Sequence, residues 1–267
     1  MMSAWTLQMA LARSCKSVAR GFSRCPKMHT TNKVVGGAIS IQPVSESYYA
    51  EVIDHVTPIF LRDEPLSQCF PPCTTGRRER DFRNYAEQQL RSGLCVVALD
   101  GGTVVGACLN RPLSKEQVMN YPLPPSDDEA EDPLNASVVR MIVTIHRQLN
   151  LFSTLGVDKL LEIGLVSVAP THIGRGLAVK MVRASVELGA RKGFRAAKAD
   201  CTGPASARAC EKAGMAPVHR LLYDEYKVKG EVVFRQTTTR GPALTVMAAK
   251  LQDSPPYVIP ATPRPKI

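Results

Sequence analysis

The pattern of apolar residues changes its period once within residues 160–192, and this change marks the centre of the predicted fold. Residues 160–169 form a run rich in Leu, Ile and Val that ends before Pro170, as is typical of a strand buried on both faces. After Gly176 the apolar residues recur at helical spacing as far as Leu188. The sequence therefore predicts a buried strand, a tight turn and an amphipathic helix in this order.

The remaining pattern predicts an α/β domain around this unit. A hairpin is expected at Asp100-Gly101-Gly102, whose residues tolerate positive φ, and the proline-rich stretch 111–135 is expected to be a loop. The predicted order is an antiparallel hairpin and then two parallel strands, each followed by a helix. This order predicts one domain with a mixed, mainly antiparallel sheet and flanking helices. Strands are expected at 38–44, 94–99, 103–109, 194–201, 218–226 and 243–249, and further helices at 46–62, 79–91, 136–151 and 204–213.

The turn between the central strand and helix has the features of a phosphate cradle. Gly174 and Gly176 allow a tight turn, and the first amides of the following helix point outward as donors. A Walker loop is excluded because no Gly-Lys-Ser/Thr ending follows, and a dinucleotide fingerprint is excluded because residue 179 is Val179. Two interpretations stay open: a phosphate site, or a glycine turn without a ligand.

Composition restricts the class of protein. The chain has 267 residues, 44% of them hydrophobic, and no apolar run approaches the roughly 18 residues that a membrane-spanning helix needs. The formal charge is +10, but residues 1–45 hold six Lys or Arg and no acid, so the excess is concentrated at the N-terminus. Because the remainder shows no basic helix stripe with clustered aromatic residues, we expect no nucleic-acid partner and no membrane partner.

The two ends of the chain differ in composition from the middle. Residues 1–36 are rich in Arg and Ser, lack acids and can form an amphipathic helix, which fits either a mitochondrial transit peptide or a plain basic tail. Met28 is an alternative start. Residues 252–267 contain five prolines and are expected to be a tail, which leaves 37–251 as the folded domain.

The eight cysteines have no framework spacing, and no signal peptide precedes them. We expect reduced thiols in an intracellular protein, with a cytoplasmic domain unless residues 1–36 direct it to mitochondria. Cys69 and Cys73 form the only close pair, and without a second Cys or His pair nearby we expect no zinc or other metal site.

A pair of carboxylates marks the end of the first predicted helix. Asp63 and Glu64 precede Pro65, which forces Glu64 out of the helical conformation. At a helix C-terminus the macrodipole disfavours negative charge and tends to raise a carboxyl pKa, which suits a general base. The alternative is an exposed turn without a chemical role.

The central run V-S-V-A-P-T-H-I-G-R-G-L-A resembles the acyl-CoA pyrophosphate loop of the GCN5-related N-acetyltransferases, Gln/Arg-x-x-Gly-x-Gly/Ala. Ile173 stands where that pattern has Gln or Arg, so a side-chain contact to phosphate is lost, and Arg175 could supply the charge instead. The resemblance implies that two parallel strands splay to admit pantetheine and that acetyl-CoA is the cofactor. It assigns cofactor binding to Val166, Ser167, Val168, Ile173, Gly174, Arg175, Gly176, Leu177 and Ala178.

Three segments, in the same order, are similar to insect arylalkylamine N-acetyltransferases: F-L-R-D-E-P-L, C-T-G-P-A-S-A-R-A-C-E-K-A-G-M and Y-D-E-Y-K-V-K-G-E-V-V-F. This resemblance covers roughly residues 38–250. It implies that Glu64 is the general base and that the two active-site hydroxyls fall on Thr202 and Ser206, with Thr202 also interpretable as a helix cap. Ser206 would protonate the CoA thiolate, with Tyr223 and Tyr226 as alternative acids, and a backbone amide near Val168 would bind the oxyanion.

The resemblance thus implies an enzyme that transfers an acetyl group from acetyl-CoA to an arylalkylamine such as dopamine, tyramine or serotonin. We expect this enzyme to be a monomer. Two alternatives stay open. One is an enzyme of the same fold that acts on a polyamine, an amino acid or a protein lysine. The other is a CoA-binding module without turnover. If Glu64 is only a turn residue, His219 is the next candidate for the base.

Overall fold

The computed structural model describes residues 38–69, 76–126, 129–130, 133–235 and 241–251. The predicted segments 1–36 and 252–267 lie outside these residues, as does Cys73. The longer elements are β1 (Ser40–Pro43), α2 (Tyr49–Asp63), α3 (Arg77–Leu90), β2 (Val96–Asp100), β3 (Thr103–Ser114), α5 (Pro133–Leu149), β4 (Lys159–Val168), α7 (Leu177–Arg191), β5 (Ala196–Cys201), α8 (Pro204–Lys212), β6 (Ala216–Leu222) and β9 (Ala243–Lys250). The shorter ones are η2 (Glu46–Tyr48), η3 (Ser67–Cys69), α4 (Lys115–Met119), α6 (Leu151–Leu155), η4 (Pro170–His172), β7 (Lys227–Val228) and β8 (Glu231–Val232).

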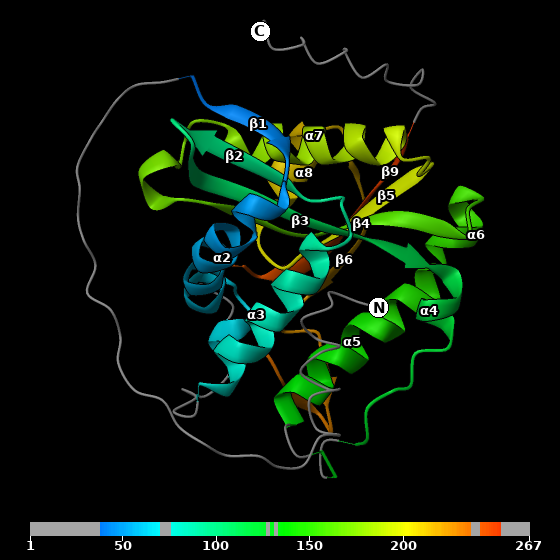
Figure 1. The fold of residues 1–267 in the computed structure, drawn as a ribbon. Coiled ribbons are helices and arrows are strands. Elements are labelled where there is room, and N and C mark those ends of the chain that lie inside the picture. Colours follow the sequence, from blue (N-terminus) through cyan, green and yellow to red (C-terminus); the bar gives the residue numbers. More distant parts are fainter. Residues whose placement is uncertain (1–37, 70–75, 127–128, 131–132, 236–240, 252–267) are drawn as a thin grey trace, which may run out of the picture.

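Seven strands form one mixed sheet in the order β1-β2-β3-β4-β5-β9-β6 (Figure 1). All neighbouring pairs are antiparallel except β4 and β5, which are parallel. The predicted mixed, mainly antiparallel sheet with one parallel pair is therefore confirmed. The parallel pair arises because α7 connects β4 to β5 as a crossover helix.

Helices cover both faces of the sheet. Helix α7 lies on one face with α8, while α2, α3 and α5 lie on the other (Figure 1). Alternate residues of each strand therefore point into two separate apolar cores. In β5, for example, Ala197, Ala199 and Cys201 point into the α7 core, whereas Lys198 and Asp200 point toward α5.

The loop predicted for residues 111–135 is wrong at both ends. Strand β3 continues to Ser114, α4 follows at once, and α5 already begins at Pro133. Pro112 is tolerated because β2 pairs with β3 only as far as Cys108, so this part of β3 has β4 as its single strand neighbour. The helix predicted for 136–151 ends at Leu149, since Asn150 adopts a positive φ of 40° before α6.

The strand predicted for 218–226 is also partly wrong. Strand β6 ends at Leu222, and the chain then forms the short hairpin β7-β8 around Lys229 and Gly230. Both turn residues have positive φ, 53° and 86°, as a two-residue hairpin turn requires. Tyr223 consequently leaves the sheet edge and is completely buried in the core.

Candidate active site

Strands β4 and β5 separate at the centre of the sheet. Their pairing stops after Ile163 and Ala199, although β4 continues to Val168 and β5 to Cys201. Beyond this fork β4 pairs with β3 alone, so among the described strands its side toward β5 has no partner. The implied splay is present, and it leaves backbone amides of β4 available to a ligand.

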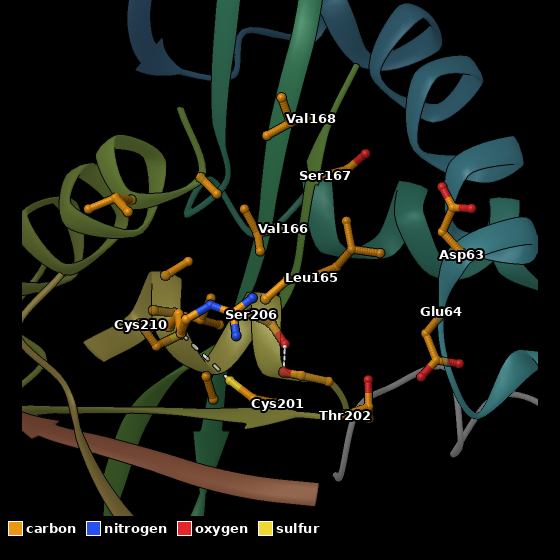
Figure 2. A pocket seen from close by; sticks show the side chains of 18 of the residues that line it. Asp63, Glu64, Leu165, Val166, Ser167, Val168, Cys201, Thr202, Ser206 and Cys210 are labelled. Carbon is orange, nitrogen blue, oxygen red and sulfur yellow. Dashed lines mark hydrogen bonds between the residues drawn. The ribbon is translucent and has the colours of Figure 1, made fainter. Parts of the chain in front are cut away.

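A pocket of about 830 Å³ opens at the fork. One wall comes from the end of α2 and the turn that follows, a second from β4 and the loop before α7, and a third from β5 and α8 (Figure 2). All three residues predicted to be catalytic, Glu64, Thr202 and Ser206, line this pocket. The predicted cofactor residues do so as well, with the exception of Arg175, which is exposed beside the pocket.

The glycine loop forms one end of the pocket and presents free helix amides there. Gly174 and Gly176 have φ values of 85° and 72°, which an L side chain adopts only with strain. Gly176 is the N-cap of α7 without a side-chain cap, so the first amides of this 15-residue helix are available to a ligand. His172 holds the loop in place, since its Nε2 lies 3.1 Å from the Asp100 Oδ2 of the β2-β3 hairpin.

Glu64 forms the opposite end of the pocket. It caps the C-terminus of α2 in an extended conformation, as Pro65 requires, and its backbone amide donates to the Phe60 carbonyl at 3.0 Å. Its Oε1 accepts the Leu66 amide at 3.0 Å and its Oε2 accepts the Ser67 amide at 2.5 Å. These two bonds hold the carboxylate in one orientation and leave further lone pairs of both oxygens for other donors.

The pKa of the Glu64 carboxyl is raised above its ordinary value. Burial is the main cause, because it disfavours the charged form. Hydrogen bonds from the turn and a polar contact with the Thr202 side chain favour the ionised form and only partly offset burial. The direction agrees with the expectation from the sequence, and desolvation is the leading cause.

The two predicted hydroxyl residues differ in their surroundings. The Thr202 side chain points toward Glu64 and interacts with its carboxylate (Figure 2). The N-cap of α8 is Gly203, so the helix-cap interpretation of Thr202 is wrong. The Ser206 hydroxyl donates to the Gly203 carbonyl at 2.9 Å, so it has to break this hydrogen bond and turn before it can donate elsewhere.

The alternative candidates have other partners. The Tyr223 hydroxyl donates to the Thr202 carbonyl at 3.0 Å, and burial raises its pKa well above the ordinary value. The Tyr226 hydroxyl donates to the Ser137 carbonyl, and its ring stacks on Phe234. His219 lies on β6 and does not belong to the described pocket lining.

Several pocket residues were missed by the sequence analysis. Ile59 and Phe60 of α2 add an apolar surface beside Glu64, and Asp200 adds a carboxylate at the fork. Asp200 could have been found, because charged residues at 198 and 200 interrupt a strand that was predicted to be buried. The side chains of Ile59 and Phe60 carry no such signal, since apolar residues on a helix are usually core residues.

Comparisons with known proteins agree with this geometry. Residues 60–215 match the profile of the "Acetyltransferase (GNAT) family". This chain belongs to the GNAT acetyltransferase family. Acetyl-CoA is the acetyl donor in this family, and the glycine loop and the fork together fit its pyrophosphate and pantetheine.

Solved structures of insect acetyltransferases share the fold. Arylalkylamine N-acetyltransferase 2 from Aedes aegypti is 25% identical over 81% of this chain and 100% of its own, with a TM-score of 0.70. A mosquito arylalkylamine N-acetyltransferase-like 5b is 19% identical over 80% of this chain and 100% of its own, with a TM-score of 0.66. Drosophila melanogaster polyamine N-acetyltransferase, which forms N-acetylagmatine, is 17% identical over 80% of this chain and 100% of its own, with a TM-score of 0.66.

Neither a metal group nor a membrane helix is found in the described part of the chain. No cluster of three or more His, Cys, Asp or Glu side chains there could hold a metal ion. Within the same residues, no helix has both the length and the apolar composition needed to cross a bilayer.

Proposed function

We propose that this protein acetylates the primary amine of an arylalkylamine, with acetyl-CoA as donor and Glu64 as general base. The observation that carries the proposal is the Glu64 carboxylate, which has a raised pKa and a fixed orientation at the pocket wall beside the β4-β5 fork. A base whose pKa lies closer to neutral pH accepts a proton from an ammonium group more readily than an ordinary glutamate does.

The proposed reaction begins with the removal of a proton from the bound ammonium group by Glu64, directly or through water. The free amine then attacks the thioester carbonyl carbon, and a β4 amide near Val168 stabilises the negative charge that develops on the carbonyl oxygen. The C–S bond then breaks, and Ser206 donates its proton to the departing CoA sulfur. The second proton of the attacking nitrogen returns to Ser206, so the products are the amide and CoA thiol, with one proton left on Glu64.

A thiol in the pocket wall is unsuited to a covalent route. Cys201 lines the pocket, and its Sγ donates to the Cys210 Sγ at 3.7 Å. This hydrogen bond and burial raise the pKa of the Cys201 thiol far above its ordinary value. Since the thiolate is the nucleophilic form, Cys201 is a poor acyl acceptor, which supports direct transfer to the amine.

The acceptor class rests on three kinds of support. The three sequence segments resemble insect arylalkylamine N-acetyltransferases, and the Aedes aegypti enzyme of that name is structurally similar. Ile59, Phe60 and Leu165 provide apolar surface for an aryl group next to the Glu64 carboxylate. The Drosophila enzyme named for polyamines makes a polyamine acceptor the main competitor.

The test is a thiol-release assay in which the full chain, acetyl-CoA and one amine at a time are combined. Tyramine and dopamine are expected to give kcat/KM at least about tenfold above agmatine, spermidine and a lysine peptide, since an apolar aryl group adds one to several kcal/mol of binding. A preference for agmatine or spermidine would assign the polyamine alternative. Binding of acetyl-CoA without thiol release for any amine would indicate a binding module.

A further inference from the structure

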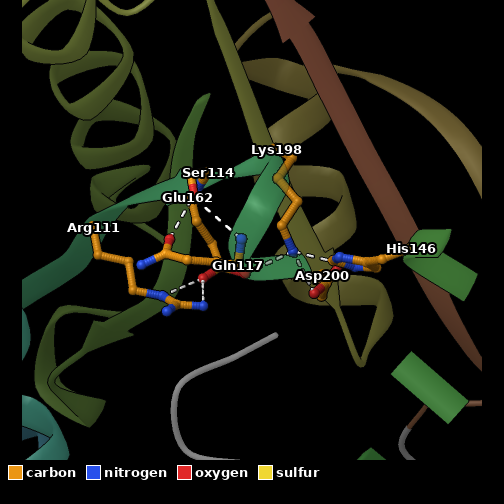
Figure 3. Close-up of polar contacts among 7 residues, drawn as sticks. All are labelled: Arg111, Ser114, Gln117, His146, Glu162, Lys198 and Asp200. Atoms are coloured by element: carbon orange, nitrogen blue, oxygen red, sulfur yellow. Dashed lines mark hydrogen bonds and ion pairs between the residues drawn. The ribbon is translucent and has the colours of Figure 1, made fainter. Parts of the chain in front are cut away.

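A row of buried charges crosses the three neighbouring strands β3, β4 and β5 (Figure 3). Arg111 on β3 is in register with Glu162 on β4, and Glu162 is in register with Lys198 on β5. The Arg111 guanidinium pairs with Glu162 Oε2, and Lys198 Nζ lies 2.6 Å from Glu162 Oε1. We call these three residues and the two described next the charge ladder.

The charge ladder continues past the fork and reaches α5. Lys198 Nζ also lies 2.6 Å from Asp200 Oδ2, on the same face of β5. Asp200 Oδ1 lies 2.9 Å from Nε2 of His146 on α5. Each of these side chains is at most 6% exposed, and the two cations hold the pKa of Glu162 below its ordinary value despite burial.

Stability alone does not account for this arrangement. Burial of four formal charges carries a large desolvation cost, and apolar residues of similar size often stabilise a core equally well. The position of the ladder suggests another role. Glu162 and Lys198 form the second-to-last pair of the β4-β5 ladder, one residue before it ends at Ile163 and Ala199. Lys198 reaches past Ala199 to Asp200, which already belongs to the pocket wall.

We propose that Lys198 is a positioning residue for acetyl transfer. By binding Glu162 on β4 and Asp200 beyond the fork at the same time, it sets how far β5 diverges from β4. Thr202, which interacts with the proposed base Glu64, follows two residues after Asp200 on the same chain segment. Without Lys198, the end of β5 is free to shift, which changes both the pantetheine slot and the place of Thr202.

This inference rests on the proposed function in those experiments that measure turnover. Lys198→Met keeps the side-chain length and removes the charge, and kcat at saturating substrates is expected to fall about 10- to 100-fold, as displacements near 1 Å typically cause. Arg111→Met is the matched control, because it also removes a buried cation paired with Glu162 but lies on β3, away from the fork. Its kcat per folded enzyme is expected to stay within about threefold of the wild type.

A purely structural role would lower the unfolding temperature of both variants and leave kcat per folded enzyme unchanged in both. Equal losses of kcat in Lys198→Met and Arg111→Met, or an unchanged kcat in Lys198→Met, would overturn the proposal. If Lys198→Met does not fold, Asp200→Asn replaces it, since this isosteric change removes the charge through which Asp200 binds Lys198 and His146. A folded Asp200→Asn enzyme with wild-type kcat would likewise overturn the proposal.

A binding measurement separates this inference from the proposed function. If the wild type releases no CoA with any amine, the proposed function fails, and the charge ladder is then tested by the Kd for acetyl-CoA. A shifted β5 is expected to raise this Kd at least about tenfold in Lys198→Met and to leave it within about threefold in Arg111→Met. Equal Kd values in the two variants would contradict the role of Lys198.

Discussion

Glu64 and Thr202 interact through their side chains at the edge of the pocket, although one follows α2 and the other follows β5. The Thr202 hydroxyl favours the ionised carboxylate, while burial favours the protonated one. This contact links the helix that carries the proposed base to the strand end that is set by the fork. Small changes at either side are therefore expected to alter the proton affinity of Glu64.

The first prediction concerns the proposed base itself. Glu64→Gln cannot accept a proton, and kcat is expected to fall by about 10² to 10⁴ at neutral pH, the usual contribution of a positioned base. Because a glutamine oxygen can replace only one of the two acceptors for Leu66 and Ser67, we also expect a loss of about 1 to 3 kcal/mol in unfolding free energy. Steady-state kinetics and thermal unfolding measure the two effects.

Asp63→Asn is the control for Glu64→Gln. Asp63 also lines the pocket but pairs with the exposed Arg62 at 2.6 Å, so its loss is expected to change kcat less than about threefold. A higher pH is expected to restore part of the Glu64→Gln activity, because more of the amine arrives deprotonated. Nearly full activity of Glu64→Gln at neutral pH would exclude Glu64 as the base.

The second prediction concerns pH dependence. A base acts only when it is ionised, so kcat/KM is expected to fall as the pH decreases through the pKa of Glu64, and this acid limb should lie above the range of an ordinary glutamate. Thr202→Val removes a polar contact that favours the ionised form, so the acid limb should move to still higher pH while the plateau stays within about threefold. Thr202→Ser keeps the hydroxyl and should leave the acid limb of the pH profile in place. An acid limb that does not move in Thr202→Val would contradict the contact between Thr202 and Glu64.

The third prediction concerns the glycine loop. CoA at a hundredfold its Kd is expected to stabilise the wild type by about 2.7 kcal/mol. Gly176→Val should remove this stabilisation, because a β-branched residue strains a φ of 72° at the proposed pyrophosphate site. Gly193→Val is the matched control, since Gly193 has a φ of 83° but follows the opposite end of α7. If CoA stabilises Gly176→Val as much as the wild type, this loop is excluded as the pyrophosphate site.

The fourth prediction concerns the N-terminal segment. Residues 1–36 fused to a fluorescent protein are expected to direct it to mitochondria, because the segment is basic, lacks acids and can form an amphipathic helix. A chain that starts at Met28 and carries the same fluorescent protein is expected to stay in the cytosol. Fluorescence microscopy of both proteins measures the difference, and diffuse signal from both would identify the segment as a basic tail.

The sequence predicted the elements that local chemistry specifies. The exit of Glu64 from α2, the turn at Gly174 and Gly176 and the β2-β3 hairpin all follow from backbone preferences of the residues present. The end of β3 and the β7-β8 hairpin were missed. Pro112 is acceptable only on a strand segment that has a neighbour on one side. Whether this part of β3 has one neighbour or two depends on where the pairing with β2 ends, which the local sequence does not specify.

By itself, the sequence determined a strand, a glycine turn and a helix at residues 160–192 and placed a carboxylate at the end of α2, because periodicity and proline act within a few residues. Only the tertiary structure decided that Thr202 reaches Glu64 and that Arg111, Glu162 and Lys198 stand in one row. Such contacts depend on which strands become neighbours and in which register. Strand order and register result from burial over the whole chain, and no local pattern specifies them.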